Sequence, residues 1–180
     1  MRFISKLILS SCIFFLAGCG FHLQGERHFP TSLQRIYLST NDPYGHLARQ
    51  LQQYLITSHV QLAKSPSEAN VLLRIISDVA SQDLLSVSST QQTRQYILRV
   101  TVIFDIADAK GTPLITPQSL VETRSLTVQS NQILGSSNEA TLLYQQMRRM
   151  LAYAIINRIT SEEITQMIEQ SKQTLITKTS

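Results

Sequence analysis

The sequence predicts an α+β fold, a two-layer sandwich in which two amphipathic helices pack on one face of a mostly antiparallel four-stranded sheet. Residues 96–106 alternate apolar and polar side chains, which is typical of a half-buried strand. Two other stretches repeat apolar residues at helical spacing. The 180 residues, 43% of them hydrophobic, suffice for one ordinary domain with its own core.

The first strand and the first helix are predicted close together. Residues 33–39 are rich in β-forming residues and predict a strand. Asp42 as N-cap and Pro43 at the first helical position predict a helix that ends near Ser58. The apolar residues at helical spacing in this helix are Leu47, Leu51, Tyr54 and Leu55.

The middle of the chain predicts strands separated by polar connections. Residues 60–62 predict a short extended piece, and residues 64–68 a loop. Residues 70–79 alternate and predict a strand. One face of that strand carries Val71, Leu73, Ile75 and Val79, and the other carries Arg74 and Asp78. Residues 81–92, rich in Ser, Thr and Gln, predict a long polar hairpin end.

Residues 96–106 give the clearest strand of the sequence. Its even positions are all apolar: Tyr96, Leu98, Val100, Val102, Phe104 and Ile106. Residues 108–111 then predict a turn. Residues 118–129 predict the fourth strand, whose poor alternation does not fix a register.

A second helix is predicted by a capping box, with Ser136 as N-cap and Glu139 three residues later. It runs to about Ile159, and Arg148 and Arg149 are assigned to its solvated face. Its predicted buried stripe is Leu143, Met147, Met150, Leu151, Ala154 and Ile155. Residues 161–180 are predicted to be a polar C-terminal tail that extends the helix weakly and then frays.

The N-terminus has the pattern of an export signal over residues 1–18, with a cationic start and a short apolar run. The sequence Leu16-Ala17-Gly18-Cys19 resembles the lipobox of bacterial lipoproteins, in which the cysteine thiol accepts lipid. We therefore predict lipidation of Cys19, a lipidated tether over 19–32 and a single domain over 33–160. Covalent lipid on Cys19 is the only non-protein group expected, with no cofactor.

Charge and hydropathy exclude two further classes. The chain has 16 basic and 12 acidic residues. Removal of Arg2 and Lys6 with the signal leaves 14 basic residues and a net charge of about +2. Binding of nucleic acid needs a clustered basic face, so no nucleic-acid partner is expected. After residue 18 the sequence has no apolar run of the roughly 18 residues that a membrane-spanning helix needs.

No catalytic or metal-binding pattern occurs in the sequence. The four histidines, none of them four residues from another, are His22, His28, His46 and His59. They predict no zinc site. The serines lack a G-x-S-x-G elbow, and no phosphate-binding glycine loop is present. We therefore predict a protein that is not an enzyme.

Arginines on or beside the predicted strands are the candidate ligand-binding residues. They are Arg74, Arg94, Arg99 and Arg124. A guanidinium suits bidentate contact with phosphate. The alternative is that each is an ordinary surface arginine or half of an ion pair, such as Arg124 with Glu122. Alternation places Arg99 and Arg74 among apolar residues on the sheet face away from the helices, and we interpret this face as a contact surface.

Several motifs of the chain resemble those of the LptE family, the lipopolysaccharide-assembly lipoproteins of Gram-negative bacteria. The mature end, Cys-Gly-Phe-His-Leu over 19–23, is similar to the family's opening. The helix start at 42–49, the strand 96–100 and Arg124 are similar as well, as are Ile133-Leu134 and the apolar stripe of the second helix. One departure is Gly135-Ser136-Ser137, where the family pattern leads us to expect a cation.

The resemblance implies a non-enzymatic subunit of the outer-membrane lipopolysaccharide translocon. Such proteins sit as a plug inside the β-barrel protein LptD, bind lipopolysaccharide and assist barrel assembly. Gly20, rather than Asp, follows the acylated cysteine, and by resemblance to the sorting pattern of bacterial lipoproteins this favours the outer membrane. The family resemblance implies a domain in the barrel lumen or facing the periplasm. The alternative is a lipoprotein adaptor of another outer-membrane machine, for barrel insertion or efflux.

Overall fold

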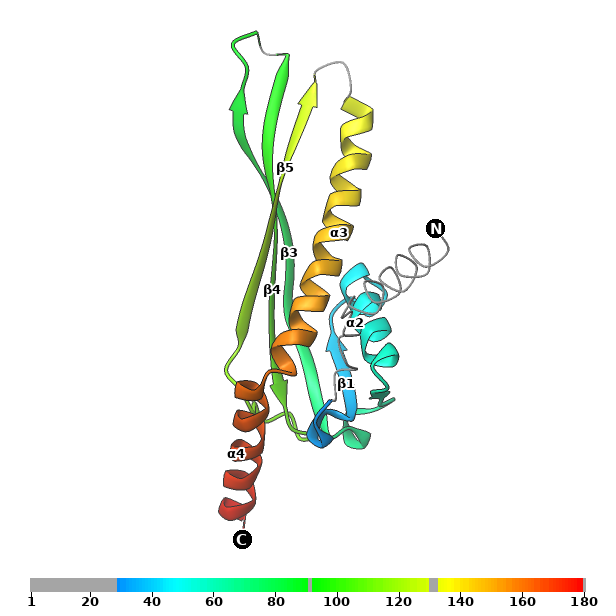
Figure 1. Cartoon of the computed structure of the whole chain (residues 1–180), viewed down its shortest axis with the longest axis vertical. Helices are drawn as coiled ribbons and strands as arrows, with labels where there is room; N and C mark the ends of the chain where they lie inside the picture. Colours follow the sequence, from blue (N-terminus) through cyan, green and yellow to red (C-terminus); the bar gives the residue numbers. More distant parts are fainter. Residues whose placement is uncertain (1–28, 91, 130–132, 180) are drawn as a thin grey trace, which may run out of the picture.

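A computed structural model gives the fold of this chain and describes residues 29–90, 92–129 and 133–179. Within these residues one sheet is combined with helices, which confirms the α+β class. Figure 1 shows an elongated molecule in which a long hairpin and helix α3 run side by side. The predictions for the signal, for Cys19 and for most of the tether lie outside the described residues.

Two numbers in the predicted fold are wrong. The strands are β1 (Arg35–Thr40), β2 (Gln61–Leu62), β3 (Val71–Val87), β4 (Thr93–Ala107) and β5 (Gln118–Gln129). The α-helices are α2 (His46–Thr57), α3 (Ile133–Ile159) and α4 (Glu162–Thr179), with short 3-10 turns η1 (Thr31–Leu33) and η2 (Pro66–Glu68). The described chain thus has five strands rather than four and three α-helices rather than two. Strand β2 has two residues, too few for any alternation to be visible.

The sheet has the order β2-β1-β3-β4-β5 and is mixed. Strand β1 pairs in parallel with both β2 and β3. The two long pairings, β3 with β4 and β4 with β5, are antiparallel, as predicted. Parallel pairing requires a crossover between the two strands, and α2 supplies it.

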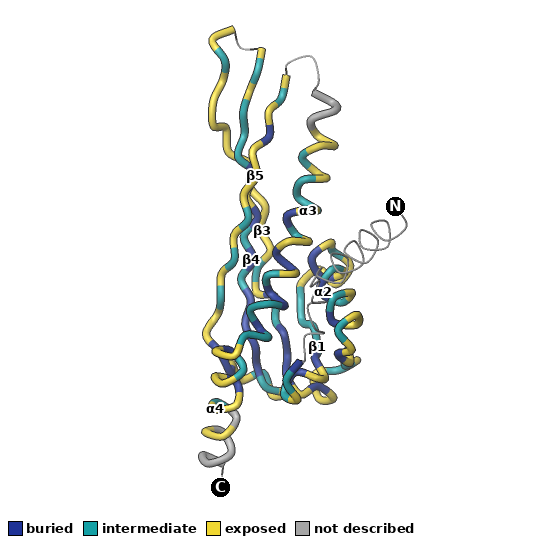
Figure 2. The backbone as a smooth tube through the Cα atoms, viewed as in Figure 1, coloured by how far each residue is buried: buried dark blue, intermediate teal, exposed yellow. Residues whose placement is uncertain are grey.

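The core lies between the sheet and helices α2 and α3, which pack against each other. The predicted even positions of β4 from Leu98 to Ile106 are all buried. Helix α3 covers them with residues spaced three and four apart, among them Met147, Leu151 and Ile155. Figure 2 shows that the buried residues gather in the half of the molecule where β1 and α2 join the sheet. The other half is the projecting hairpin with the first turns of α3.

The hairpin is longer than its sequence suggests. Strand β3 continues to Val87, which pairs with Arg94, so most of the polar segment 81–92 is strand rather than hairpin end. All residues from 78 to 87 are exposed. Backbone pairing with β4 suffices to make these residues a strand. Because both faces of this segment are exposed to water, its sequence does not need to alternate apolar and polar residues.

A β-bulge at Ile76 reverses the alternation of β3. Ile75 pairs with Phe104, but Ser77 pairs with Ile103, which leaves Ile76 as the extra residue. Beyond the bulge the even residues of β3 face the helices. Asp78 therefore points to α3, and Val79 lies on the opposite face, 56% exposed. The predicted faces of residues 70–79 are correct up to Ile75 and wrong after it.

The start of α2 also differs from the prediction. The helix begins at His46 with Gly45 as N-cap, not at Asp42 and Pro43. The Gly45 N–H donates to the Asp42 carbonyl at 3.2 Å in a turn before the helix. A Cβ on Gly45 would meet the exposed Asp42 carboxylate, which would have to move to make room for it.

Helix α3 starts earlier than predicted, and the helical extension expected after Ser161 is a separate helix. The helix already includes Ile133, so the predicted N-cap Ser136 is a residue within it. Met150 of the predicted buried stripe is 49% exposed. Residues 162–179 form α4, which buries Ile164 and Ile168 beside the base of the sheet. Within the described residues, no helix is both long and apolar enough to span a membrane.

Candidate functional site

Arg74, the first of the predicted arginines, is held by a buried carboxylate. Its Nε lies 2.7 Å from Oδ1 of Asp105, and its Nη2 lies 2.5 Å from Oδ2. Its Nη1 donates to the Gly111 carbonyl at 3.1 Å. Asp105 is only 2% exposed, and its hydrogen bond raises the pKa of the Arg74 guanidinium. Because all three nitrogens already donate to the protein, Arg74 fixes the 108–111 turn onto the sheet.

That turn forms as predicted. One carboxylate oxygen of Asp108 accepts the N–H groups of Lys110 and Thr112, at 2.9 and 2.7 Å. Gly111 has a φ of 88°, a left-handed conformation that glycine adopts without strain. The turn thereby presents its Gly111 carbonyl to Arg74.

Arg124 forms the ion pair that the sequence suggested. Its Nη2 lies 2.8 Å from Oε1 of Glu122 on the same strand. Both residues lie on the helix-facing side of β5, since they pair with Leu98 and Val100 of β4. The Arg124 side chain is 48% exposed, so the pair contributes little to stability.

Of the four predicted arginines, Arg94 and Arg99 are exposed and form no ion pair with a described residue. Arg49 and Arg149, on helices α2 and α3, are likewise exposed and form no ion pair among these residues. Arg94 has an even position in β4 and Arg99 an odd one, so the two side chains lie on opposite faces of the sheet. Arg94 pairs with Val87 and Val128 near the hairpin end, and Arg99 lies about 17 Å further along the strand. The structure therefore brings Arg74 and Arg99 to one face and Arg94 and Arg124 to the other, and it does not gather the four into one cluster.

The hairpin end combines Arg94 with exposed apolar side chains. Three apolar residues of β3 near the end of the hairpin are 44–56% exposed: Leu84, Leu85 and Val87. A second bulge, at Leu85, lies within this end. Apolar side chains beside an unpaired guanidinium suit an amphiphilic ligand with an acidic head group.

Helix α3 is fastened to the hairpin by contacts that the sequence analysis missed. The Arg148 Nε donates to both carboxylate oxygens of Asp78, at 3.1 and 2.8 Å. The Tyr144 hydroxyl donates to the Ser81 carbonyl at 2.9 Å. Arg148 was predicted to be solvated, but its side chain is only 20% exposed. The bulge at Ile76 turns Asp78 toward Arg148, and the sequence pattern does not show that bulge.

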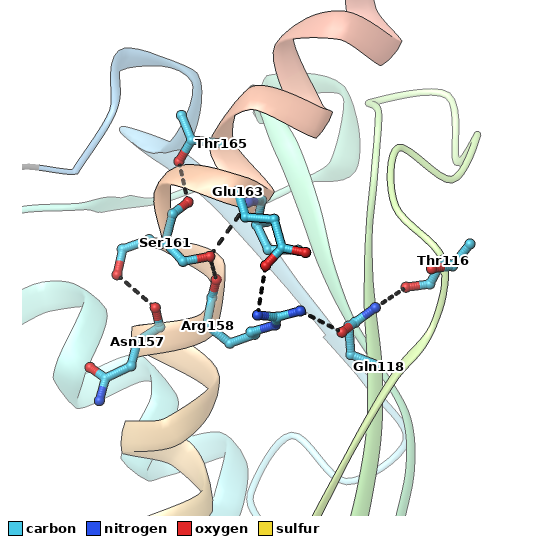
Figure 3. A network of polar contacts seen from close by, with 9 residues as sticks. Thr116, Gln118, Asn157, Arg158, Ser161, Glu163 and Thr165 are labelled. Atoms are coloured by element: carbon cyan, nitrogen blue, oxygen red, sulfur yellow. Dashed lines mark hydrogen bonds and ion pairs between the residues drawn. The ribbon is translucent and has the colours of Figure 1, made fainter.

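A second polar network joins α3 to α4, as Figure 3 shows. Arg158 donates to Glu163 at 3.0 Å and to the Gln118 side chain of β5 at 3.4 Å. The Ser161 hydroxyl donates to the Arg158 carbonyl at 2.8 Å. These contacts set the direction in which α4 leaves the end of α3, and they are structural.

The described residues contain no group of three or more side chains that could hold a metal ion. A groove of about 800 Å³ lies between α2, β1 and α3, next to the tilted ring pair Tyr54 and Tyr153. Its lining is mixed polar and apolar. The candidate site that the geometry supports is the hairpin end, where Arg94 lies beside exposed apolar side chains.

The fold is that of a class of bacterial lipoproteins. It is similar to a minor lipoprotein from Acinetobacter baumannii (TM-score 0.63, 24% identity, 73% of this chain and 93% of that one). It is also similar to rare lipoprotein B from Shewanella oneidensis (TM-score 0.63, 25% identity, 73% and 97%).

The chain belongs to the LptE family, described as lipopolysaccharide-assembly, whose model matches residues 33–159. Its relatives include the LPS-assembly lipoprotein LptE of Photorhabdus laumondii, 29% identical over 158 residues (87% of this chain, 85% of that protein). The protein of the same name from Yersinia enterocolitica is 30% identical over 162 residues (87% and 75%). The resemblance inferred from the sequence motifs is confirmed.

Proposed function

We propose that this chain is a lipid-anchored subunit of the machine that assembles lipopolysaccharide at the outer membrane, where it acts with an LptD-like β-barrel as plug and lipopolysaccharide-binding subunit. The observation that carries the proposal is the family match over residues 33–159, nearly the whole predicted domain. Its relatives carry the name LPS-assembly lipoprotein. In this role the chain is not an enzyme and needs no cofactor beyond lipid on Cys19.

The shape of the molecule supports the plug. Strand β3 has 17 residues, which at about 3.3 Å per residue extend over roughly 55 Å. A membrane barrel spans a hydrocarbon layer of roughly 30 Å. The hairpin with α3 along it forms a rod that is long enough to fill such a lumen from end to end (Figure 1).

Arg94 and Arg99 support the binding of lipopolysaccharide phosphates better than Arg74 and Arg124. The guanidinium of Arg74 is already bound by Asp105, and that of Arg124 by Glu122. A phosphate would have to displace these carboxylates. The cation that the family pattern leads us to expect in this region is absent from this chain, which has Gly135-Ser136-Ser137 in the first turn of α3. We therefore assign the head-group contacts to Arg94 and Arg99.

The test is purification of the lipoprotein from detergent-solubilised outer membrane, with its partners identified by mass spectrometry. Recovery of a large β-barrel together with lipopolysaccharide is the expected result. Recovery of a barrel-insertion or efflux complex instead would favour the adaptor alternative. The same mass spectra check the anchor, since a mature chain that starts elsewhere than residue 19, or lacks acyl mass, contradicts the lipid on Cys19.

A further inference from the structure

Strand β5 ends the sheet on one side and leaves a long free backbone edge. It pairs with β4 through twelve residues, from Gln118 to Gln129, without a register shift. No described strand pairs with its other side. The strand contains no proline and no lysine, and its two charges neutralise each other in the Arg124–Glu122 pair. Proteins usually protect long edges with proline, lysine or uncompensated charge, because an unprotected edge is a template for another strand.

The other free edge of the hairpin is protected. Strand β1 pairs with β3 only as far as Ile75, so residues 76–87 also form an edge. That edge has bulges at Ile76 and Leu85 and carries two acids, Asp78 and Asp83. Bulges and charges both oppose the addition of a strand. The two edges of the same hairpin are therefore built differently.

Helix α3 extends its apolar surface past β5. Arg148 and Tyr144 contact β3, while Arg158 contacts Gln118 of β5. With about 3.6 residues per turn, these residues lie at successive angles around the helix axis, from the side that faces β3 to the side that faces β5. Further around the axis in the same direction lies a stripe of apolar residues: Leu143, Met150 and Ala154. Met150 is 49% exposed and the other two are partly exposed, so no described element covers this stripe fully.

We infer that the β5 edge and this α3 stripe form one slot that accepts an extended strand from the barrel partner. Water can hydrogen-bond the free backbone groups of β5 in the unbound protein, and an extended backbone can replace that water along the whole edge. A strand added there would present alternate side chains to the α3 stripe, which requires apolar residues. Its other face would continue the hydroxyl-rich outer face of β5, formed by Ser119, Thr123, Ser125 and Thr127. This inference rests on the proposed function.

The required occupant has strict apolar–polar alternation and little charge, which is the pattern of membrane-barrel strands. A second copy of this chain fits less well. Its β5 could pair with this β5, but its own α3 would come with it and compete for the space that the first α3 covers. A single strand, loop segment or unclosed barrel edge brings no such helix.

Hydrogen exchange of the wild-type protein tests the slot directly. In the free lipoprotein, alternate amides of residues 118–129 point away from β4 and exchange fast. In the purified complex with the barrel, we expect these amides to become protected, while the bulged edge at residues 76–87 exchanges as before. Unchanged exchange of residues 118–129 in the complex would overturn the inference while leaving the proposed function intact. Protection already present in the free protein, with a dimer mass, would assign the edge to a second copy and overturn it too.

Proline substitution provides the matched test. Thr123 and Arg124 are neighbours, so one N–H points to β4 and the other points outward. We expect one of Thr123→Pro and Arg124→Pro to lower the melting temperature, and the other to keep it but recover at least tenfold less barrel. Arg124→Ala separates loss of charge from loss of the N–H. Undiminished barrel recovery with the folded proline variant would refute the slot. A wild-type protein that recovers no barrel would instead refute the proposed function, and the slot with it.

Discussion

The carboxylate of Asp105 is almost fully buried on the sheet face away from the helices, and Arg74 compensates its charge. Their bidentate contact joins neighbouring strands, and the third contact of Arg74 reaches the Gly111 carbonyl. Breaking a buried pair on one side leaves the other charge desolvated, and this costs more than the pair itself contributes.

Asp105→Ala should therefore destabilise the protein by about 2–3 kcal/mol, since loss of one partner of a fully buried pair costs roughly 3–5 kcal/mol and Arg74 remains 30% exposed. Equilibrium urea unfolding measures the change. Arg124→Ala, which removes the exposed pair with Glu122, is the control and should cost no more than about 0.5 kcal/mol. An equal loss of unfolding free energy in the two variants would show that the buried Arg74–Asp105 pair contributes no more than the exposed Arg124–Glu122 pair.

Tyr144 should make the free energy of unfolding decrease at alkaline pH. Burial raises the pKa of its phenol above the ordinary 10.0, so the unfolded chain loses this proton at lower pH than the folded one. The contribution to stability is complete below pH 10 and is lost as pH rises through the folded-state pKa. Urea unfolding between pH 9 and 11.5 should show a shallower decline for Tyr144→Phe. Tyr44→Phe, which removes the hydroxyl from a residue that is 85% exposed, is the matched surface substitution.

At the scale of elements, α4 shows why the sequence predicts no more than a weak helix after Ser161. Its apolar residues are sparse, and only Ile164 and Ile168, spaced four apart, are buried among the described residues of the helix. That spacing is a signal for one narrow helical stripe, but a stripe of two residues is too short to distinguish from a polar tail. The same spacing makes the contribution of each isoleucine measurable.

Ile168→Ala should destabilise the protein by roughly 2–4 kcal/mol, because a fully buried isoleucine leaves a cavity when it is truncated. Met167→Ala removes a neighbouring side chain of similar size that is 43% exposed, and it should cost well under about 1 kcal/mol. Thermal unfolding followed by circular dichroism compares the two. If the Met167 variant proved as unstable as the Ile168 variant, the docked face of α4 would be assigned incorrectly.

Elements whose alternation reflects burial could be predicted from the sequence. The even residues of strand 96–106 are buried from Leu98 onward, so the predicted face was correct, although β4 begins at Thr93, three residues earlier than predicted. The predicted bounds of β5, 118–129, were also correct. The bulge at Ile76 could not be predicted, because beyond it both faces of β3 lie in water or against polar groups of α3. A one-residue shift there leaves no trace in the hydrophobic pattern.

At the scale of the whole molecule, the candidate arginines show why a site is harder to predict than a strand. Their positions along the strands followed from the sequence, but their partners depend on the register between strands. Arg74 meets Asp105 because residues 74 and 105 are opposite each other in the sheet. Arg94 and Arg99 are exposed and make no ion pair with a described residue, so they stay the candidates for contact with a ligand.

The double variant Arg94→Ala/Arg99→Ala should bind lipopolysaccharide at least about tenfold more weakly and unfold like the wild type. Charge-assisted hydrogen bonds contribute roughly 1.5–3 kcal/mol each, and about 1.4 kcal/mol corresponds to a factor of ten. Binding of labelled lipopolysaccharide to the purified protein measures it. Because the two residues lie on opposite faces, the effects of the single variants should add. Full binding by the folded double variant would exclude both arginines from the site.

The mixed pairing of the sheet has a consequence for the order in which the chain folds. The long hairpin closes through a connection of only a few residues between Val87 and Thr93, and β5 follows after one further short connection. Strand β1, in contrast, reaches β3 only after α2 and β2 have been placed, and a parallel pairing of that kind closes a longer loop. We therefore expect the three-stranded meander β3–β4–β5 to form first, and β1 and α2 to pack on it later. A nascent chain would then expose its rod-shaped half before its core is complete.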